Sequence, residues 1–185
     1  AKYVDKIFVD VVLNSSGNKV GLVSYKSDVP YEFGCTEDSN WVEYLTKNET
    51  KLKCQIDSYK AKPGERCLCC AIKRGRDFLN DTYSNSSRKK FIVLMSDGTA
   101  EKTTPDLDKC GENYTGNPGQ DAINQACLAK QEGITVHSVG FGIGANLTLL
   151  QEIADCGGGE LFSSTNLSGL EEIYKSIAKS IIEIS

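Results

Sequence analysis

The chain has 185 residues, of which 39% are hydrophobic and 25% are charged, and it carries a formal net charge of −4 with an isoelectric point near 5.1. This acidic balance gives no electrostatic reason to expect binding to nucleic acid or to an anionic membrane. No apolar run reaches the roughly 18 residues that a membrane span requires, so we expect no direct membrane span.

The spacing of apolar residues predicts helices and strands that alternate along most of the chain. In chain order, we expect a helix over 2–13, a strand over 20–25, a short edge strand over 31–33, a weakly helical segment over 41–60, a helix over 67–79, a strand over 90–96, a helix over 120–131, a strand over 134–141, a helix over 147–155, a short strand over 160–163 and a helix over 168–182. Ser168, with Glu171 three residues later, is the predicted N-cap of the last helix. The alternation predicts an α/β fold, with a doubly wound, mostly parallel sheet and helices on both faces. Without internal repeats or a linker, residues 1–185 are expected to form a single domain.

The strand over 90–96 leads directly into a candidate site. Five consecutive apolar residues, Phe91 to Met95, precede Ser96-Asp97-Gly98, a pattern typical of a strand buried on both faces. Ligands of open α/β sheets gather at the carboxyl ends of the strands. Asp97 is therefore expected where binding takes place.

Cysteines and glycosylation sequons favour an oxidising, extracytoplasmic compartment. The eight cysteines form an even set without the paired spacing of zinc sites: Cys35, Cys54, Cys67, Cys69, Cys70, Cys110, Cys127 and Cys156. Seven Asn-X-Ser/Thr sequons are expected to carry glycans: Asn14, Asn48, Asn80, Asn85, Asn113, Asn146 and Asn166. The alternative interpretation is that these asparagines are simply polar turn residues.

Sequence alone cannot settle the disulfide pairing. Cys110 and Cys127 flank the end of the long polar loop over 98–118, and we favour a bond between them. Cys35 and Cys54, which bracket an irregular segment, are the second predicted pair. A zinc or iron–sulfur site at Cys67-Leu68-Cys69-Cys70 is the alternative for that cluster, and its spacing disfavours it. His137 lies in mid-strand and is the only histidine, so a structural role is expected for it.

Three segments resemble the von Willebrand factor A-type domain family. They are residues 19–25, the strand that ends in Ser96-Asp97-Gly98, and residues 133–142. Residues 149–154 and the glycine-rich turn after Cys156 extend the resemblance. It implies a Rossmann-like sheet and, in many members, a divalent metal at the strand ends.

The family's metal site uses an Asp-x-Ser-x-Ser loop after the first strand, a threonine before the third helix and an aspartate after the fourth strand. Asp97 matches the aspartate, whereas Arg66 stands at the threonine and cannot ligate a cation. We hypothesise that the Arg66 guanidinium replaces the ion by pairing with Asp97. No cofactor is therefore expected, and Mg²⁺, with Asp97 as a ligand, is expected only if the missing upstream loop is present.

The resemblance also implies a central first strand that the sequence lacks, flanked by residues 19–25 and 90–96. Buried, unpaired backbone groups at two strand edges would each cost about 1–3 kcal/mol. We therefore expect the 185 residues to be a portion of a longer polypeptide that supplies this strand. The alternative is a strand donated by another subunit.

The resemblance implies a non-enzymatic protein-binding or adhesion module that is extracellular or at the cell surface. The expected binding face comprises residues 24–28, 63–66, 96–99 and 141–145, with Ser24, Asp28, Arg66, Asp97, Gly98 and Thr99 in contact with a protein partner. The alternative is a structural subunit of a glycosylated surface layer or extracellular filament, which binds like subunits. A hydrolase would need a nucleophile elbow or a base–nucleophile pair, and the sequence shows neither.

Overall fold

The computed structural model describes residues 2–15, 17–25, 43–58, 65–80, 87–105 and 110–184. The helices within these ranges are α1 (Lys2–Leu13), α2 (Glu49–Ser58), α3 (Leu68–Asn80), α4 (Pro118–Gln131), α5 (Leu147–Gly157) and α6 (Leu167–Ile184). The strands are β1 (Val20–Leu22), β2 (Glu43–Thr46), β3 (Lys90–Ser96), β4 (Ile134–Phe141) and β5 (Gly158–Ser164). None of the helices in these ranges is long and apolar enough to cross a membrane.

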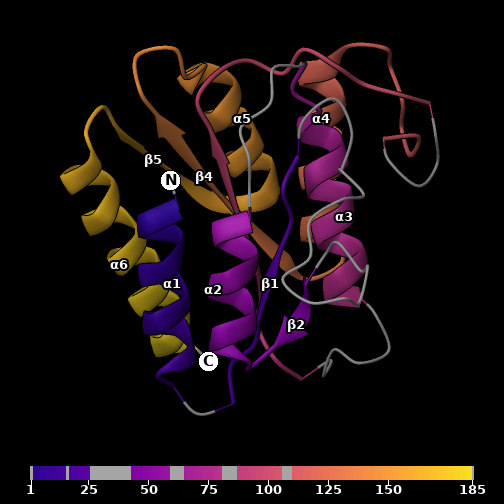
Figure 1. Ribbon diagram of the computed structural model, residues 1–185. Coiled ribbons are helices and arrows are strands. Elements are labelled where there is room, and N and C mark those ends of the chain that lie inside the picture. Colours follow the sequence, from indigo (N-terminus) through magenta and orange to yellow (C-terminus); the bar gives the residue numbers. More distant parts are fainter. Residues whose placement is uncertain are drawn as a thin grey trace.

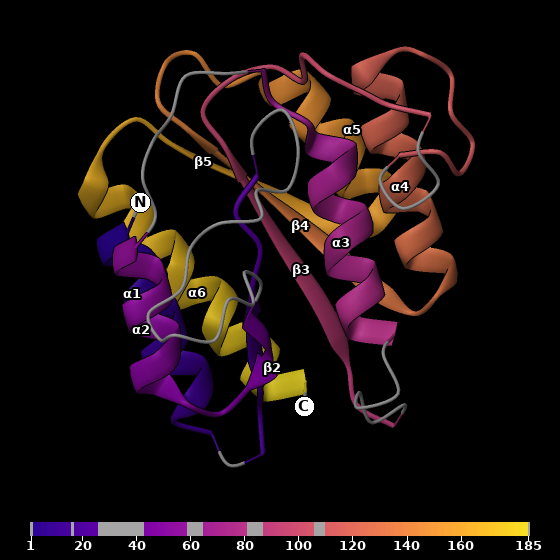
Figure 2. The same ribbon diagram turned by 45° about the vertical axis from the view of Figure 1, so that its right-hand side comes forward.

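The strands lie between two layers of helices, with α1, α2 and α6 on one side and α3, α4 and α5 on the other (Figures 1 and 2). One hydrophobic cluster joins the second layer to the sheet and includes Ile72, Leu94 and Val136. Another cluster packs α1 and α6 against the opposite face and includes Val4 and Leu170. The predicted α/β architecture with helices on both faces is confirmed.

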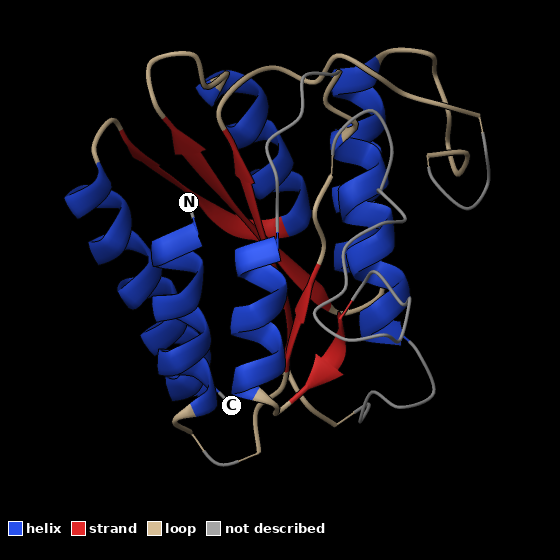
Figure 3. Ribbon diagram, viewed as in Figure 1, coloured by secondary structure: helices blue, strands red, loops and turns tan. Residues whose placement is uncertain are grey.

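The central sheet has the order β3-β4-β5, and both pairs of neighbours are parallel (Figure 3). β3 pairs with β4 without interruption from Lys90 opposite Ile134 to Ser96 opposite Gly140. Because β4 has a strand on each side and helices on both faces, Ile134, Val136 and Val139 are almost fully buried. All three strands therefore end at the same edge of the sheet, which we call the carboxyl edge.

The segment over 41–60 differs from the weak helix predicted from the sequence. β2 forms over Glu43–Thr46, and α2 begins only at Glu49. Asn48 separates the two elements, because its Oδ1 accepts a hydrogen bond from the backbone nitrogen of Lys51 at 3.0 Å and so caps the helix. The edge strand predicted over 31–33 lies outside the described residues.

The start of α6 also differs from the prediction. Ser168 is already inside the helix, which begins at Leu167, and the capping residue is Asn166. Its Oδ1 accepts a hydrogen bond from the backbone nitrogen of Gly169 at 2.8 Å, and its carbonyl accepts one from Leu170. Asparagine is as good an N-cap as serine, so the capping-box pattern of Ser168 and Glu171 misplaced the helix start.

Helix α5 passes into β5 with no connecting residue. The helix ends at Gly157, and Gly158, with φ of 70°, both caps it and begins the strand. A left-handed backbone of this kind favours glycine at the end of a helix. At Gly159 a Cβ atom would overlap the carbonyl of Val136, so the close approach of β5 to β4 also requires glycine.

β1 and β2 form a separate antiparallel pair, and β1 does not hydrogen bond to β3. Just before β1 and β3 begin, Arg88 Nη1 donates to the carbonyl of Gly17 at 2.8 Å. Beyond their ends, Tyr25 Oη donates to the carbonyl of Met95 at 2.5 Å. β1 and β3 therefore run in the same direction, as neighbours of one intervening parallel strand would.

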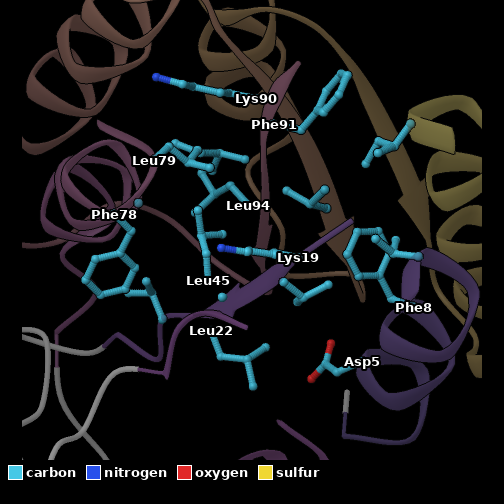
Figure 4. Close-up of a pocket in the computed structure, with 18 of the residues that line it drawn as sticks. Asp5, Phe8, Lys19, Leu22, Leu45, Phe78, Leu79, Lys90, Phe91 and Leu94 are labelled. Carbon is cyan, nitrogen blue, oxygen red and sulfur yellow. The ribbon is translucent and has the colours of Figure 1, made fainter. Parts of the chain in front are cut away.

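A cavity of about 1420 Å³ lies between β1 and β3 and is lined by residues 19–25 and 87–97 together with side chains of α1, α3 and α6. We call this cavity the slot. Figure 4 shows Leu22 and Leu45 from one pair of strands facing it, and Phe91 and Leu94 from β3. The two stretches predicted to flank a central strand thus border one common space.

The slot corrects the prediction that the strand over 90–96 is buried on both faces. Phe91, Ile92, Val93 and Met95 are all partly exposed, although they pack against the hydrophobic clusters. β4 covers only one edge of β3, and the open side of the slot leaves the remaining surface accessible.

The described disulfides join Cys67 to Cys70, Cys69 to Cys110 and Cys127 to Cys156. The predicted Cys110–Cys127 bond is therefore wrong. Cys127 lies nine residues after the start of α4, about 13 Å along its axis, whereas a disulfide needs Cα atoms about 5.5 Å apart. Cys54 is also disulfide-bonded, and its predicted partner Cys35 lies outside the described residues.

Candidate functional site

The turn that follows β3 presents Asp97 at the carboxyl edge. Ser96 is buried, and its hydroxyl donates to the carbonyl of Gly98 at 3.2 Å while it accepts from the backbone nitrogen of Gly98 at 3.4 Å. These bonds close a tight turn around Asp97 and leave its side chain 68% exposed. A Cβ atom at Gly98 would lie 2.8 Å from Arg66 Cζ, so a larger residue here would displace the guanidinium from its place over this turn.

Arg66, just before α3, links three segments of this edge. Its Nε donates to Asp97 Oδ1 at 3.1 Å, and its Nη1 pairs with Glu101 Oε2 at 3.0 Å. The backbone of Arg66 also accepts hydrogen bonds from the nitrogens of Glu101 and Lys102. Burial lowers the pKa of Arg66, but the hydrogen bonds and charges of Asp97 and Glu101 raise it by more than burial lowers it. The net effect raises the pKa of Arg66, so the guanidinium stays charged.

This ion-pair group is open to solvent. The side chains of Arg66, Asp97 and Glu101 are 34%, 68% and 40% exposed. Exposed ion pairs contribute roughly 0–1 kcal/mol to stability. The group is therefore accessible to a ligand, and the fold does not depend on it.

The loop over 142–146 lies directly beside Asp97. Gly142 donates a backbone hydrogen bond to Ser164 at the end of β5, and a Cβ atom at Gly144 would stand 3.0 Å from the carbonyl of Asp97. Between these glycines, Ile143 is 99% exposed. An apolar side chain thus projects into solvent next to the Arg66–Asp97–Glu101 group. We call Arg66, Asp97, Glu101 and Ile143 the carboxyl-edge face.

The comparison with known families agrees with the α/β fold described above. Residues 1–176 match the family model of the von Willebrand factor type A domain. The chain belongs to this family. No curated protein matches the sequence.

Solved structures of von Willebrand factor A domains share the fold at low sequence identity. The von Willebrand domain of the type V pili tip protein Mfa5 from Porphyromonas gingivalis has a TM-score of 0.75 and 17% identity, covering 100% of this chain and 88% of that chain. The pilus adhesin SpaC from Lactobacillus rhamnosus GG has a TM-score of 0.69 and 17% identity over 98% of this chain and 27% of its own. Proximal thread matrix protein 1 from the mussel byssus has a TM-score of 0.67 and 21% identity, covering 96% of this chain. The chain spans only 41% of that byssus protein chain.

The described residues do not fit the divalent cation that the family implies. Mg²⁺ requires several oxygen ligands in octahedral geometry. Here the carboxylates of Asp97 and Glu101 are both paired with the Arg66 guanidinium, and the Ser96 hydroxyl is turned toward Gly98. The positive charge of Arg66 occupies the space beside Asp97 and repels a cation. The Arg66–Asp97 contact predicted from the sequence is present.

The other predicted contact residues fall into two groups. Ser24 lines the slot beside Tyr25, and Gly98 and Thr99 continue the turn after Asp97. Asp28 lies outside the described residues, as do Pro63 and Gly64. Sequence reasoning placed residues 141–145 in the expected binding face but did not single out Ile143 as a contact residue. A single isoleucine between glycines was the available signal, because no core periodicity accounts for it.

The predicted structural role of His137 agrees with its contacts. Its Nδ1 accepts a hydrogen bond from the backbone nitrogen of Glu160 at 3.2 Å, and its ring packs between Phe91 and Phe162. Burial lowers the pKa of His137, and the charge of Glu160 only partly opposes this effect. The imidazole is therefore held in the sheet in its neutral form.

The described sequon asparagines differ in how their amides are used. Asn48, Asn146 and Asn166 each accept a helix-capping hydrogen bond through Oδ1, which leaves Nδ2, the nitrogen that carries an N-linked sugar, free of that contact. Asn80 instead donates from Nδ2 to Glu132 at 2.7 Å. Asn14 and Asn113 are exposed, and Asn85 lies outside the described residues. Capping and glycosylation are thus compatible at three sites.

Proposed function

We propose that this chain is a non-enzymatic, extracellular protein-binding or adhesion module that acts through the carboxyl-edge face. Family membership supports a binding role, since the pilus tip protein and pilus adhesin with this fold are surface proteins by their descriptions. The disulfides and the exposed sequons support an oxidising, extracytoplasmic location.

The observation that carries the proposal is the exposure of Ile143 beside a charged group. Exposed apolar patches with a polar rim mark interaction surfaces, whereas a single exposed apolar side chain is common, so the proposal rests on Ile143 together with Arg66. Binding energy at interfaces is concentrated in a few anchor residues, among which arginine is frequent. Ile143 with Arg66 gives one such pair, and Asp97 with Glu101 supplies the charged rim.

We further propose that this face binds its partner without Mg²⁺. Arg66 supplies the positive charge that the cation supplies elsewhere in the family, and it holds Asp97 in a fixed position. Adding millimolar Mg²⁺ is expected to leave the melting temperature unchanged, and a chelator is expected to leave partner binding unchanged. Loss of binding on chelation would contradict a metal-free face.

The test is adhesion of beads coated with the chain to cells and matrix of its native source. Ile143→Ser and Arg66→Ala are expected to reduce bead retention at least about tenfold, because they remove the apolar anchor and the charge. Lys89→Ala is the control, since Lys89 is exposed just before β3, at the opposite edge of the sheet. The free energy of unfolding of each variant should lie within about 1 kcal/mol of that of the wild type. Unchanged retention for both face variants would reject this function.

The slot favours a second candidate function, a structural subunit of a surface layer or filament whose sheet is completed by a donated strand. Both strands that border the slot have an edge that no other described strand pairs with. Strand addition at such edges is a known mode of subunit assembly. Electron microscopy of the native assembly tests this candidate. Isolated particles without regular lateral contacts would exclude it.

A further inference from the structure

Four cysteine sulfurs meet in one buried cluster. Cys67, Cys69 and Cys70 come from the start of α3, and Cys110 comes from the segment that precedes α4. All four residues are at most 1% exposed. Between the two disulfides, Cys67 Sγ lies 3.6 Å from both Cys69 Sγ and Cys110 Sγ, and Cys70 Sγ lies 3.4 Å from Cys110 Sγ. All four sulfurs lie within 4.8 Å of one another.

These separations match the dimensions of a tetrahedral tetrathiolate site. With zinc–sulfur bonds of about 2.3 Å, neighbouring sulfurs of such a site are about 3.8 Å apart. The sulfurs that are not bonded to each other are already close to that spacing. Reduction of the two disulfides would therefore give four thiols that can surround a small ion with little movement of the backbone.

The local electrostatics favour thiolates at this position. Cys69 and Cys70 lie in the first turn of α3, a helix of 13 residues. The helical hydrogen bonds begin with the one that the Ala71 nitrogen donates to the carbonyl of Cys67. The backbone nitrogens of that turn carry a partial positive charge, which stabilises anions. Cys69 Sγ also lies 3.6 Å from the hydroxyl of Thr103, which donates its proton to Asp121 Oδ2 at 2.6 Å.

We propose that Cys67, Cys69, Cys70 and Cys110 form a Zn²⁺ site in the reduced chain, in place of the Cys67–Cys70 and Cys69–Cys110 disulfides. A dithiol or phosphine reductant supplies four electrons, and four protons are taken up as the two disulfides become four thiols. Binding of Zn²⁺ releases the four protons and gives a tetrathiolate with a net charge of −2. Two equivalents of an oxidising disulfide reverse the reaction: they accept four electrons, become four thiols, and the two protein disulfides form as the ion is released.

The exchange keeps the same segments together in both redox states. The Cys69–Cys110 disulfide ties the segment before α4 to the start of α3, next to Arg66. Zinc bound to the same sulfurs makes the same connection in a reducing compartment. The position of Arg66 at the carboxyl edge is then held before and after disulfide formation.

The test uses the chain reduced anaerobically with a phosphine, freed of reductant and titrated with Co²⁺ and then Zn²⁺. Tetrahedral thiolate coordination gives intense visible and near-ultraviolet cobalt bands, which Zn²⁺ abolishes as it displaces the cobalt. Native mass spectrometry is expected to show one zinc bound with the loss of four protons. Cys110→Ser and Cys69→Ser are expected to lose the cobalt bands.

The matched control is the double variant Cys127→Ser/Cys156→Ser, which removes a disulfide outside the cluster and should keep the full cobalt spectrum. If the reduced chain unfolds without metal, recovery of its circular dichroism on adding Zn²⁺ supports the site, because metal binding then drives folding. A folded reduced chain that binds no cobalt overturns the proposal. An unfolded chain that zinc does not restore also overturns it, as does a cobalt spectrum that is lost equally in the control.

Discussion

At the scale of single residues, two buried serines in neighbouring strands have opposite environments. Ser138 in β4 is fully buried, and among the described side chains its hydroxyl is the one buried polar group without a hydrogen-bond partner. Ser96 in β3 is equally hidden, but its hydroxyl holds the turn at Gly98. Burial of an unpaired hydroxyl is destabilising, whereas loss of a paired hydroxyl removes a favourable contact.

Ser138→Ala is therefore expected to raise the free energy of unfolding by about 1 kcal/mol, and Ser96→Ala to lower it by about the same amount. Urea denaturation of both variants measures these changes. A destabilised Ser138→Ala variant would mean that its hydroxyl has a partner, such as a bound water.

The carboxyl group of Asp5 in α1 gives the chain an unusual dependence on pH. Burial raises the pKa of Asp5 from 3.8 to about 6. Between these values the folded state holds a proton that the unfolded state releases. The free energy of unfolding must then fall as pH rises through this window.

Asp5→Asn is expected to remove this penalty and to stabilise the chain at pH 7 by about 2–3 kcal/mol. Urea denaturation at pH 4 and pH 7 should show a smaller decline for the variant than for the wild type. Asp10→Asn on the same helix is the control, because Asp10 is half exposed and paired with Lys53, so its effect should stay within about 1 kcal/mol. Equal pH dependence in all three chains would contradict the assignment to Asp5.

At the scale of elements, one buried arginine joins α3 to the end of α4. Arg76 is 4% exposed, and its guanidinium pairs with Glu132, with Glu112 at 2.9 Å and with Gln125 at 2.5 Å. The hydrogen bond from Arg76 lowers the pKa of Glu132 more than burial raises it. The stability from this pair is present above the ordinary pKa of glutamate, 4.5, and is lost as pH falls through the lower folded value.

Arg76→Met is expected to lower the free energy of unfolding by about 2–4 kcal/mol, because the Gln125 amide oxygen and the Glu112 carboxylate lose the guanidinium. Glu132 loses it too and retains the hydrogen bond from Asn80. Arg74→Met on the same helix is the control, since Arg74 lies at the surface of α3 over the ring of Phe78 at 5.0 Å. Thermal unfolding of both variants compares them. A difference below about 1 kcal/mol would show that the network carries little energy.

The elements that the sequence predicted well are those with strong local patterns. The apolar runs of β3 and β4 and the helical spacing of α1 and α3 fixed their positions to within one or two residues. β2 was missed because its four residues carry no alternation long enough to separate it from the helix that follows.

The candidate site likewise has features that the sequence predicts and features that it does not. The Arg66–Asp97 pair was predictable because both residues sit at family positions that meet at the carboxyl edge. The cysteine pairing was not predictable, since it depends on how α4 lies against α3 and α5. The exposure of Ile143 depends likewise on the path of a glycine-rich loop, which no periodicity describes.

At the scale of the whole molecule, the strands on the two sides of the slot differ in how many backbone hydrogen bonds hold them. β4 is hydrogen bonded along both edges, whereas β1 has three residues and pairs only with β2 among the described strands. Local openings are easiest where few backbone bonds and buried contacts hold a segment.

Amide hydrogen exchange is therefore expected to be slowest in β4 and much faster in β1 and along the slot edge of β3. Exchange followed by mass spectrometry of peptides from these strands measures the difference. Equal protection of β1 and β4 would show that something fills the slot and pairs with both edges.

The direct passage from α5 into β5 has a mechanical consequence. Load applied at Ile143 enters the sheet through Gly142 and the end of β4, and on the other side it passes through α5 to Gly157, where β5 follows without a connector. Because the Cys127–Cys156 bond fastens α5 to α4, tension on the path through α5 is shared covalently between two helices before it reaches β5. A module built this way resists pulling by stiffness rather than by extension.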